Sequence, residues 1–208
     1  YGDIMIRFWQ LSIAVLGNAL GTALMDSSNM GLTAWGIGAK NLSLYFDVSL
    51  GFGFIILSIF FYSISVIIRK KFILREFIES FAFLFAFSIF TNYFATIMPD
   101  IRSWNFIIRL FVDTTGLFIL LFAIAVHLKV MIAVHPMDVY MKTMQDKMKS
   151  VVAGTFFTYS SAFAVAIIFG LLYGNITGIG YGTIMTLLFG GIIIKLYNVF
   201  ILSFWKFK

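Results

Sequence analysis

Residues 151–173 read VVAGTFFTYSSAFAVAIIFGLLY, a run of 23 residues without a single charged side chain. A helix needs about 20 consecutive, mostly apolar residues to cross the roughly 30 Å hydrocarbon core of a bilayer. The stretch therefore predicts a membrane-spanning helix.

The rest of the chain has the same character. Of its 208 residues 61% are hydrophobic and only 12% are charged, whereas soluble domains carry roughly 25% charged residues. We therefore expect an all-α membrane protein with six transmembrane helices, forming a single transmembrane domain over residues 1–208. The five other predicted spans are Ile4–Met25, Val48–Ile68, Leu74–Met98, Asn105–Val130 and Ile179–Phe204.

The basic residues lie between the apolar runs and predict the orientation. Residues 69–71 are Arg-Lys-Lys, residues 142–149 contain three lysines, and Lys206 and Lys208 follow the last span. The connection 174–178 has no charge. Basic loops stay on the cytoplasmic side, so both termini are expected to be cytoplasmic. The net charge of +6 is explained in this way, and we expect no nucleic-acid partner.

Two connections are much longer than the usual 2–8 residues between packed helices. They cover residues 26–47 and 131–150, and each contains a mixed polar and apolar segment, 39–46 and 138–144. Two interpretations remain open at this point. The segments are either broken, re-entrant helices inside the protein, or amphipathic helices lying in the membrane interface.

The two halves of the chain resemble each other at an offset of about 102 residues. Residues 31–36 (GLTAWG) correspond to 133–138 (AVHPMD), and 49–52 (SLGF) correspond to 152–155 (VAGT) with one inserted residue. Three spans per half make the second copy enter the membrane from the opposite side. We therefore expect two inverted three-helix repeats, over about 1–100 and 101–208, an arrangement common in secondary transporters. Chance similarity between apolar stretches is the alternative.

Four short motifs carry a resemblance to a bacterial membrane family known as YczE/YyaS/YitT-like. They are residues 30–35 (MGLTAW), 47–51 (DVSLG), 135–138 (HPMD) and 178–183 (GIGYGT). The resemblance covers most of the chain. It implies a multi-pass protein of the bacterial cytoplasmic membrane, with transport as the usual suggestion for its activity.

Two charged residues four positions apart are candidates for a solute site. Arg109 and Asp113 share one face of the fourth span and are expected to pair. An unpaired carboxylate at that depth is costly and is a functional candidate by default. The alternatives are a structural ion pair or a carboxylate that binds solute or protons.

The long connections supply the other candidates. His135 and Asp138 are three residues apart and could share a ligand or a proton; alternatively, Pro136 starts a helix and Asp138 stabilises its first turn. Trp35 and Thr33 could cradle a small solute, or Trp35 could belong to an interfacial aromatic belt. His127, near the end of the fourth span, is a second histidine close to His135 and Asp138, but the spacing of the three residues fits no metal signature.

No catalytic motif or nucleotide-binding loop is present, so we expect neither an enzyme nor a cofactor or metal. The sequence favours a small secondary transporter or permease for an unknown small solute. The alternatives are a substrate-binding membrane subunit that docks on a separate ATP-driven complex, as in energy-coupling-factor importers, and an accessory membrane protein without transport. The expected partners are the lipid bilayer and a small-molecule solute, with a homodimer or docking to a membrane complex also possible.

Overall fold

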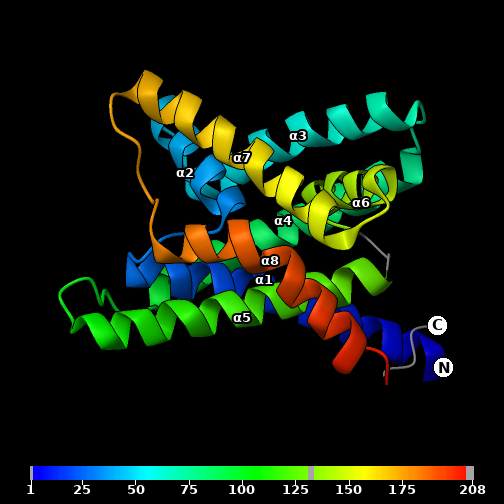
Figure 1. Ribbon diagram of the computed structural model, residues 1–208, viewed down its shortest axis with the longest axis horizontal. Helices are drawn as coiled ribbons and strands as arrows, with labels where there is room; N and C mark the ends of the chain where they lie inside the picture. Colours follow the sequence, from blue (N-terminus) through cyan, green and yellow to red (C-terminus); the bar gives the residue numbers. More distant parts are fainter. Residues whose placement is uncertain (1, 131–133, 205–208) are drawn as a thin grey trace.

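The computed structural model describes residues 2–130 and 134–204, with side chains from Phe8 onward (Figure 1). Within these residues the chain forms eight α-helices and no strand. The lysines at 206 and 208 lie outside the described residues. The helices are α1 Gly2–Ser28, α2 Ala34–Phe46, α3 Leu50–Arg69, α4 Leu74–Ile97, α5 Phe106–Val130, α6 Pro136–Met148, α7 Val151–Tyr173 and α8 Tyr181–Phe200.

Six of these helices are long and apolar enough to cross a membrane, which confirms the six predicted spans. The predicted span 151–173 coincides with α7, and the other boundaries differ by a few residues. The chain is therefore a multi-pass, all-α membrane protein. The six spans are Phe8–Ser28, Leu50–Arg69, Leu74–Ile97, Phe106–Val130, Val151–Tyr173 and Tyr181–Phe200.

The two remaining helices, α2 and α6, occupy the long connections. Each has 13 residues, about half the length needed to span a membrane, and nine residues of each are buried. A helix lying in the membrane interface would expose one whole face to water and headgroups. The interfacial interpretation is therefore wrong, and both segments are buried half-length helices packed within the protein.

The two half-length helices end in the same way. Asp47 after α2 and Lys149 after α6 both adopt the left-handed conformation, with φ of 52° in each case. Ser49 and Ser150 then cap the N-termini of α3 and α7 with their side chains. One additional residue separates the two caps in the first half, so Ser49 corresponds to Ser150, whereas the sequence comparison placed its inserted residue in the second half.

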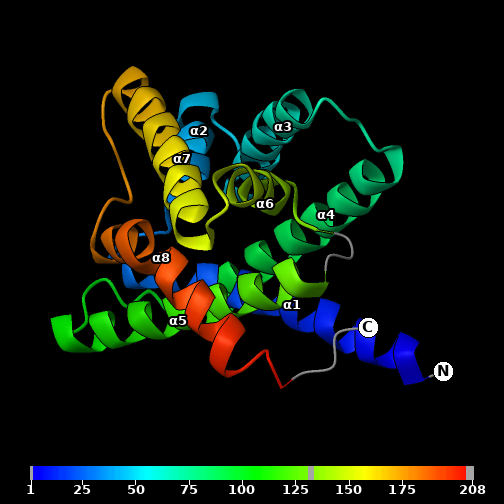
Figure 2. The same ribbon diagram turned by 45° about the vertical axis from the view of Figure 1, so that its right-hand side comes forward.

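The helices form two groups, which Figure 2 separates. Helices α2, α3, α6 and α7 form a closed ring in which α2 packs on α3 and α7, and α6 packs on the same two helices. In the second group α1 crosses α5, α4 packs on α1, and α8 packs on α5. Each group contains two helices from each half of the chain, so the halves interlock.

The crossing of α1 and α5 depends on glycines. A β-carbon added to Gly17 would lie 2.9 Å from Cβ of Ala123, and one added to Gly21 would lie 2.7 Å from Cβ of Leu120. Small residues at such spacing allow the two backbones to approach closely, as they do in membrane helix pairs. Gly17 and Gly21 are therefore the positions that allow α1 and α5 to pack closely.

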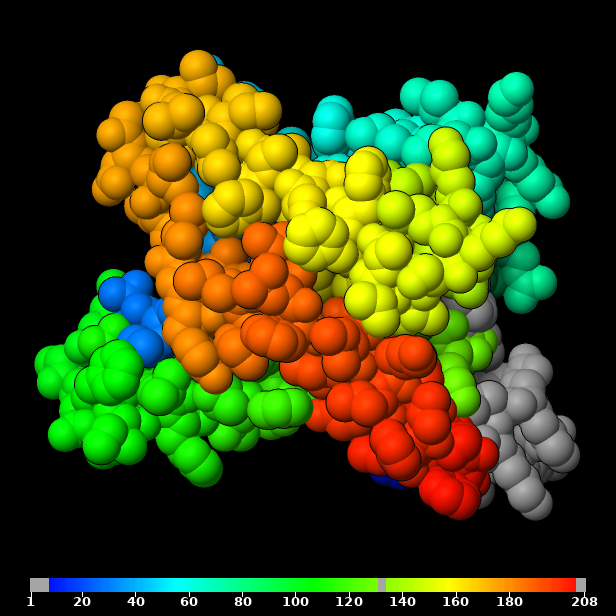
Figure 3. Space-filling view, in the orientation of Figure 1, coloured from blue at the N-terminus to red at the C-terminus, as the bar shows by residue number. Residues whose placement is uncertain are grey.

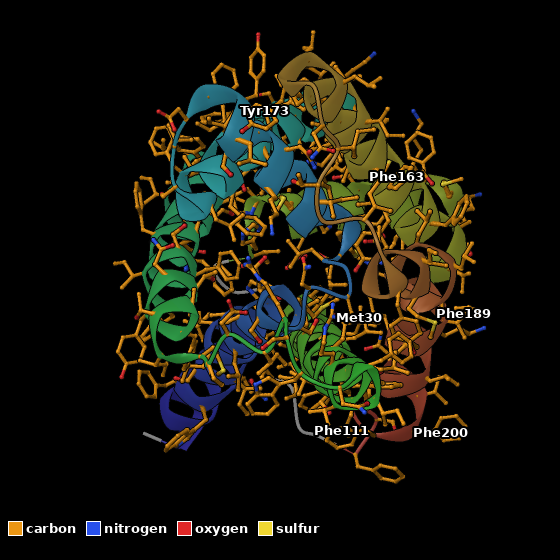
Figure 4. The ribbon with its side chains drawn as sticks, turned by 90° about the vertical axis from the view of Figure 1, so that its left-hand side faces the viewer. Met30, Phe111, Phe163, Tyr173, Phe189 and Phe200 are labelled. Atoms are coloured by element: carbon orange, nitrogen blue, oxygen red, sulfur yellow. The ribbon has the colours of Figure 1, made fainter. Side chains whose placement is uncertain are left out.

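The outer surface is apolar, as a lipid-facing surface should be. Figure 3 shows one face, formed mainly by α5, α7 and α8. In Figure 4 Phe111, Phe189 and Phe200 point away from the helices, and their side chains are all exposed. Met30, in the connection between α1 and α2, lies among the helices in the same view.

The charged connections gather at one end of the molecule, on the right in Figure 1, which we call the basic end. It contains the C-terminal ends of α3 and α6, with Arg69, Lys70, Lys147 and Lys149. The connections 98–105 and 174–180 lie at the opposite end. Near the basic end Arg69 forms a forked pair with Glu76, at 2.9 and 2.6 Å, which ties α3 to the first turn of α4.

Candidate functional site

The first turn of α2 is fixed by two residues that the sequence singled out. Thr33 precedes the helix in extended conformation, and its Oγ1 accepts a hydrogen bond of 3.0 Å from the backbone N–H of Gly36. Trp35 follows and is 4% exposed. Its ring packs edge-on against Phe61 of α3, with ring centroids 4.9 Å apart. An aromatic-belt residue would face headgroups, so that alternative is wrong for Trp35.

The first turn of α6 has the same design with different residues. Pro136 occupies the first turn, and Nδ1 of His135 accepts a hydrogen bond of 3.2 Å from the backbone N–H of Met137. His135 is therefore the N-cap of α6. Because Nδ1 accepts, the proton of the neutral ring resides on Nε2. The alternative in which Pro136 starts a helix is confirmed.

His135 is held neutral by its surroundings. Burial lowers its pKa from the usual 6.5 to about 4, and His127 acts in the same direction, while Asp138 opposes both. The rings of Phe83 and Phe87 meet the imidazole edge-on, with centroids 5.6 and 5.4 Å away. These apolar neighbours offer a charged ring no compensation.

Asp138 pairs with His127 and not with His135. Its Oδ2 lies 3.1 Å from Nδ1 of His127, in the last turn of α5. His127 is fully buried and stacks on Phe83, with ring centroids 4.1 Å apart. Asp138 also lies in the first turn of α6, where the positive end of the helix dipole stabilises a carboxylate. The sequence suggested that His135 and Asp138 could share a ligand or a proton. In the structure His135 caps α6 through the backbone N–H of Met137, whereas Asp138 pairs with His127.

Both half-length helices begin at one small cavity of about 30 Å³, which we call the central cavity. Its polar side chains are each at most 9% exposed, so water outside the protein hardly reaches them. Two nitrogens of lining residues, Nε1 of Trp35 and Nε2 of His135, are buried with no hydrogen-bond partner. The lining residues are Asn18, Thr22, Thr33, Trp35, Phe54, Phe87, Leu120, Ile124, His135, Met137 and Asp138.

The structure thus brings together four of the six residues singled out from the sequence, namely Thr33, Trp35, His135 and Asp138. Thr33 and His135 are 102 residues apart, the offset of the proposed repeat, and each is the N-cap of a half-length helix. Asn18 and Thr22 were not selected as site residues. They lie one turn apart on α1, and this spacing was the only signal in the sequence that they share a face.

Arg109 and Asp113 lie outside the central cavity, and they do not pair. Nε and Nη2 of Arg109 donate to the carbonyl oxygens of Ser28 and Asn29, at 2.8 and 3.0 Å. Oδ1 of Asp113 accepts a hydrogen bond of 2.8 Å from Ser28, while Oδ2 is buried without a partner. The predicted ion pair is wrong because the end of α1 provides both residues with closer partners.

Next to Asp113, the connection between α1 and α2 crosses the connection between α7 and α8. The backbone N–H of Leu32 donates to Gly178, and that of Gly182 donates to Met30, at 3.0 and 3.3 Å. A β-carbon at Gly31 would lie 2.7 Å from the backbone of Gly180, and Gly31 has a φ of +122°, so the crossing requires glycine there. Two of the motifs quoted above, 30–35 and 178–183, meet here.

The crossing extends into α2 through a polar side chain. Nδ2 of Asn41 donates to the carbonyl oxygen of Thr177, and Oδ1 of Asn41 accepts from the backbone N–H of Thr177, at 2.9 and 3.0 Å. The two connections are therefore tied together by backbone and side-chain hydrogen bonds. Among the described residues, no three His, Asp or Glu side chains are grouped so as to hold a metal ion.

Comparison with known proteins gives one match. Residues 5–199 match DUF6198, described as a family of unknown function. No curated protein and no solved structure matches the chain.

Proposed function

The chain belongs to the DUF6198 family, whose function is unknown, and we propose that it is a small secondary transporter or permease in which the central cavity is the solute site. The observation that carries the proposal is the meeting of two buried half-length helices at one cavity. Half-helices whose N-termini meet at a central site are a recurring way for transporters to bind solutes in the middle of a membrane.

The likeness of the halves supports the proposal. Each half consists of a long helix, a half-length helix and two long helices, with matching caps at residues 33 and 135. Each half contributes three spans, an odd number, so the second half enters the membrane from the side opposite to the first. The positions of the basic loops fit this inverted arrangement. Such a pair can expose a site between the halves to one side of the membrane and then to the other by a rocking motion.

We further propose a bacterial cytoplasmic membrane with the basic end in the cytoplasm, as the positive-inside rule implies. In this orientation the crossing of the connections 29–33 and 174–180 is the outer closure. Asp113, buried beside this closure with one free oxygen, is the candidate proton carrier.

The absence of cysteine from the sequence allows a direct test. Thr22→Cys places a thiol on the cavity wall, and membrane-impermeant thiol reagents are applied to either face of oriented vesicles. A transporter that opens alternately becomes labelled from both faces. Labelling from neither face contradicts the proposal, and labelling from the outer face alone favours the docking subunit of an ATP-driven complex.

Three control variants calibrate this test. Ala166→Cys, fully buried in α7 and away from the cavity, should stay unlabelled. Ser103→Cys, in the connection 98–105, should react only from outside. Lys149→Cys, at the basic end, should react only from inside, so the last two also test the proposed orientation.

A further inference from the structure

We propose that the central cavity recognises a compact monovalent anion; this rests on the proposed function, because it names the solute class of the same site. The proposal starts from the polar atoms that lack partners. Trp35 and His135 both line the cavity, and their ring nitrogens, Nε1 and Nε2, are buried and have no hydrogen-bond partner. Both are N–H donors, because indole only donates and Nδ1 of His135 is already an acceptor.

Buried donors without partners are costly, because they lose the hydrogen bonds that water would supply. A solute that supplies acceptor atoms removes this cost. Two acceptors on the cavity wall are already engaged: Oγ1 of Thr33 accepts from Gly36, and Oδ2 of Asp138 lies against His127. The cavity therefore offers free donors to a ligand that accepts hydrogen bonds.

The helix ends add a favourable potential. The N-terminus of an α-helix carries about half a positive charge and favours anions. Two such ends, those of α2 and α6, meet at the cavity. The carboxylate of Asp138, in the first turn of α6, offsets the positive potential at the N-terminus of that helix. The first turn of α2 contains no acidic residue. An anion beside Trp35 would offset the positive potential at the N-terminus of α2.

A cation is the main competing solute, because Asp138 and the rings of Trp35, Phe54 and Phe87 could attract one. Against this, the cavity is lined by two residues with partnerless N–H donors and by the first residues of two half-length helices. The size of the cavity also restricts the ligand. Its volume of about 30 Å³ is small, so only a compact solute of a few non-hydrogen atoms fits.

The experiment uses the purified full chain with nitrate as the probe and gluconate as a bulky reference anion. We expect nitrate to raise the melting temperature and gluconate not to do so. Trp35→Phe keeps an aromatic ring but removes the Nε1–H, and should weaken nitrate binding at least tenfold. Trp104→Phe, at an exposed tryptophan, is the matched control and should leave it unchanged.

Two further variants separate anion from cation. Asp138→Asn removes a negative charge from the cavity wall and should strengthen nitrate binding. His135→Asp keeps an N-cap acceptor but adds a negative charge, and should abolish nitrate binding. Stabilisation by methylammonium gluconate that is lost in Asp138→Asn would establish a cation site and overturn the proposal. So would nitrate binding that Trp35→Phe does not change, or stabilisation by urea alone.

The experiments distinguish a failure of the anion proposal from a failure of the transport proposal. If the thiol of the Thr22→Cys variant is labelled from both faces but nitrate neither binds nor moves, transport stands and the anion proposal falls. If nitrate binds through Trp35 but that thiol is labelled from neither face, the anion site stands and transport falls. Current recordings from reconstituted protein add the sign of the transported charge, which is negative for nitrate.

Discussion

Gly21 of α1 and Gly116 of α5 face each other where the two helices cross. A β-carbon added to Gly21 would lie 2.6 Å from the carbonyl oxygen of Gly116, and one added to Gly116 would lie 2.9 Å from that of Gly21. No flexible side-chain end lies at these positions, so a larger residue has to displace backbone. The crossing brings one long helix of each half into direct contact and holds the two halves together.

Gly21→Val should therefore lower the free energy of unfolding by about 1–3 kcal/mol, the usual cost of overpacking. The measurement is thermal or denaturant-induced unfolding in detergent. Leu16→Val, at a partly lipid-exposed position of the same helix, is the control and should have a much smaller effect. Equal stability of Gly21→Val and the parent protein would show that α1 and α5 do not cross this closely.

Replacing Arg109 should loosen the end of α1. Arg109→Ala removes two charged hydrogen bonds to the carbonyl oxygens of Ser28 and Asn29, each worth about 1.5–3 kcal/mol at most. We expect a clear fall in melting temperature. Arg102→Ala is a matched control, because Arg102 is exposed and forms only a surface pair with Asp100. A larger loss in the control would contradict this role of Arg109.

Asp113→Asn should abolish the pH dependence of solute uptake while leaving expression intact. The amide still accepts the hydrogen bond from Ser28, but it cannot gain or lose a proton. The measurement is uptake into vesicles at a series of pH values, with the parent protein as reference. An unchanged pH profile in the variant would exclude Asp113 as a proton carrier.

Acid should destabilise the protein through His135. In the unfolded chain this residue takes up a proton below its usual pKa of 6.5, but in the folded protein only below about 4. Between these values the unfolded state binds more protons, so stability falls as the pH is lowered through this window. The melting temperature of the parent protein should fall more steeply from pH 6.5 to 4 than that of His135→Asn, which keeps a capping acceptor. Parallel curves would refute this contribution.

His127 and Asp138 should behave as a coupled pair. His127→Phe keeps the ring stacked on Phe83 but leaves the buried carboxylate of Asp138 without its partner, at a cost of about 3–5 kcal/mol. Combining it with Asp138→Asn should cost less than the two single changes added together. A double-mutant cycle measures the coupling, and strict additivity would show that the pair contributes nothing.

Much of this architecture could be predicted from the sequence. The six spans follow from uncharged runs such as 151–173, because lipid demands apolar length. The half-length helices follow from two connections too long to be turns, and Thr33 and His135 stand at corresponding positions in them. These features depend on residues close together in the chain.

What could not be predicted depends on distant residues. The spacing of Arg109 and Asp113 allows a pair, but carbonyl oxygens 80 and 81 residues away are better placed to receive the arginine. The burial of Trp35 and the contact of His127 with Asp138 likewise require the packing of α2 and α6 within the ring. The motifs 30–35 and 178–183 were both visible in the sequence, but nothing in either indicated that they touch.

The bonds between Asn41 and Thr177 also constrain how the protein is made. A ribosome synthesises Asn41 136 residues before its partner, and α7, on which α2 packs, follows only in the second half. Until then Oδ1 of Asn41 lacks the hydrogen-bond donor that it has in the folded protein. The nascent first half must therefore keep α2 at the membrane surface or within the insertion machinery, and it completes its own fold only after the second half has arrived.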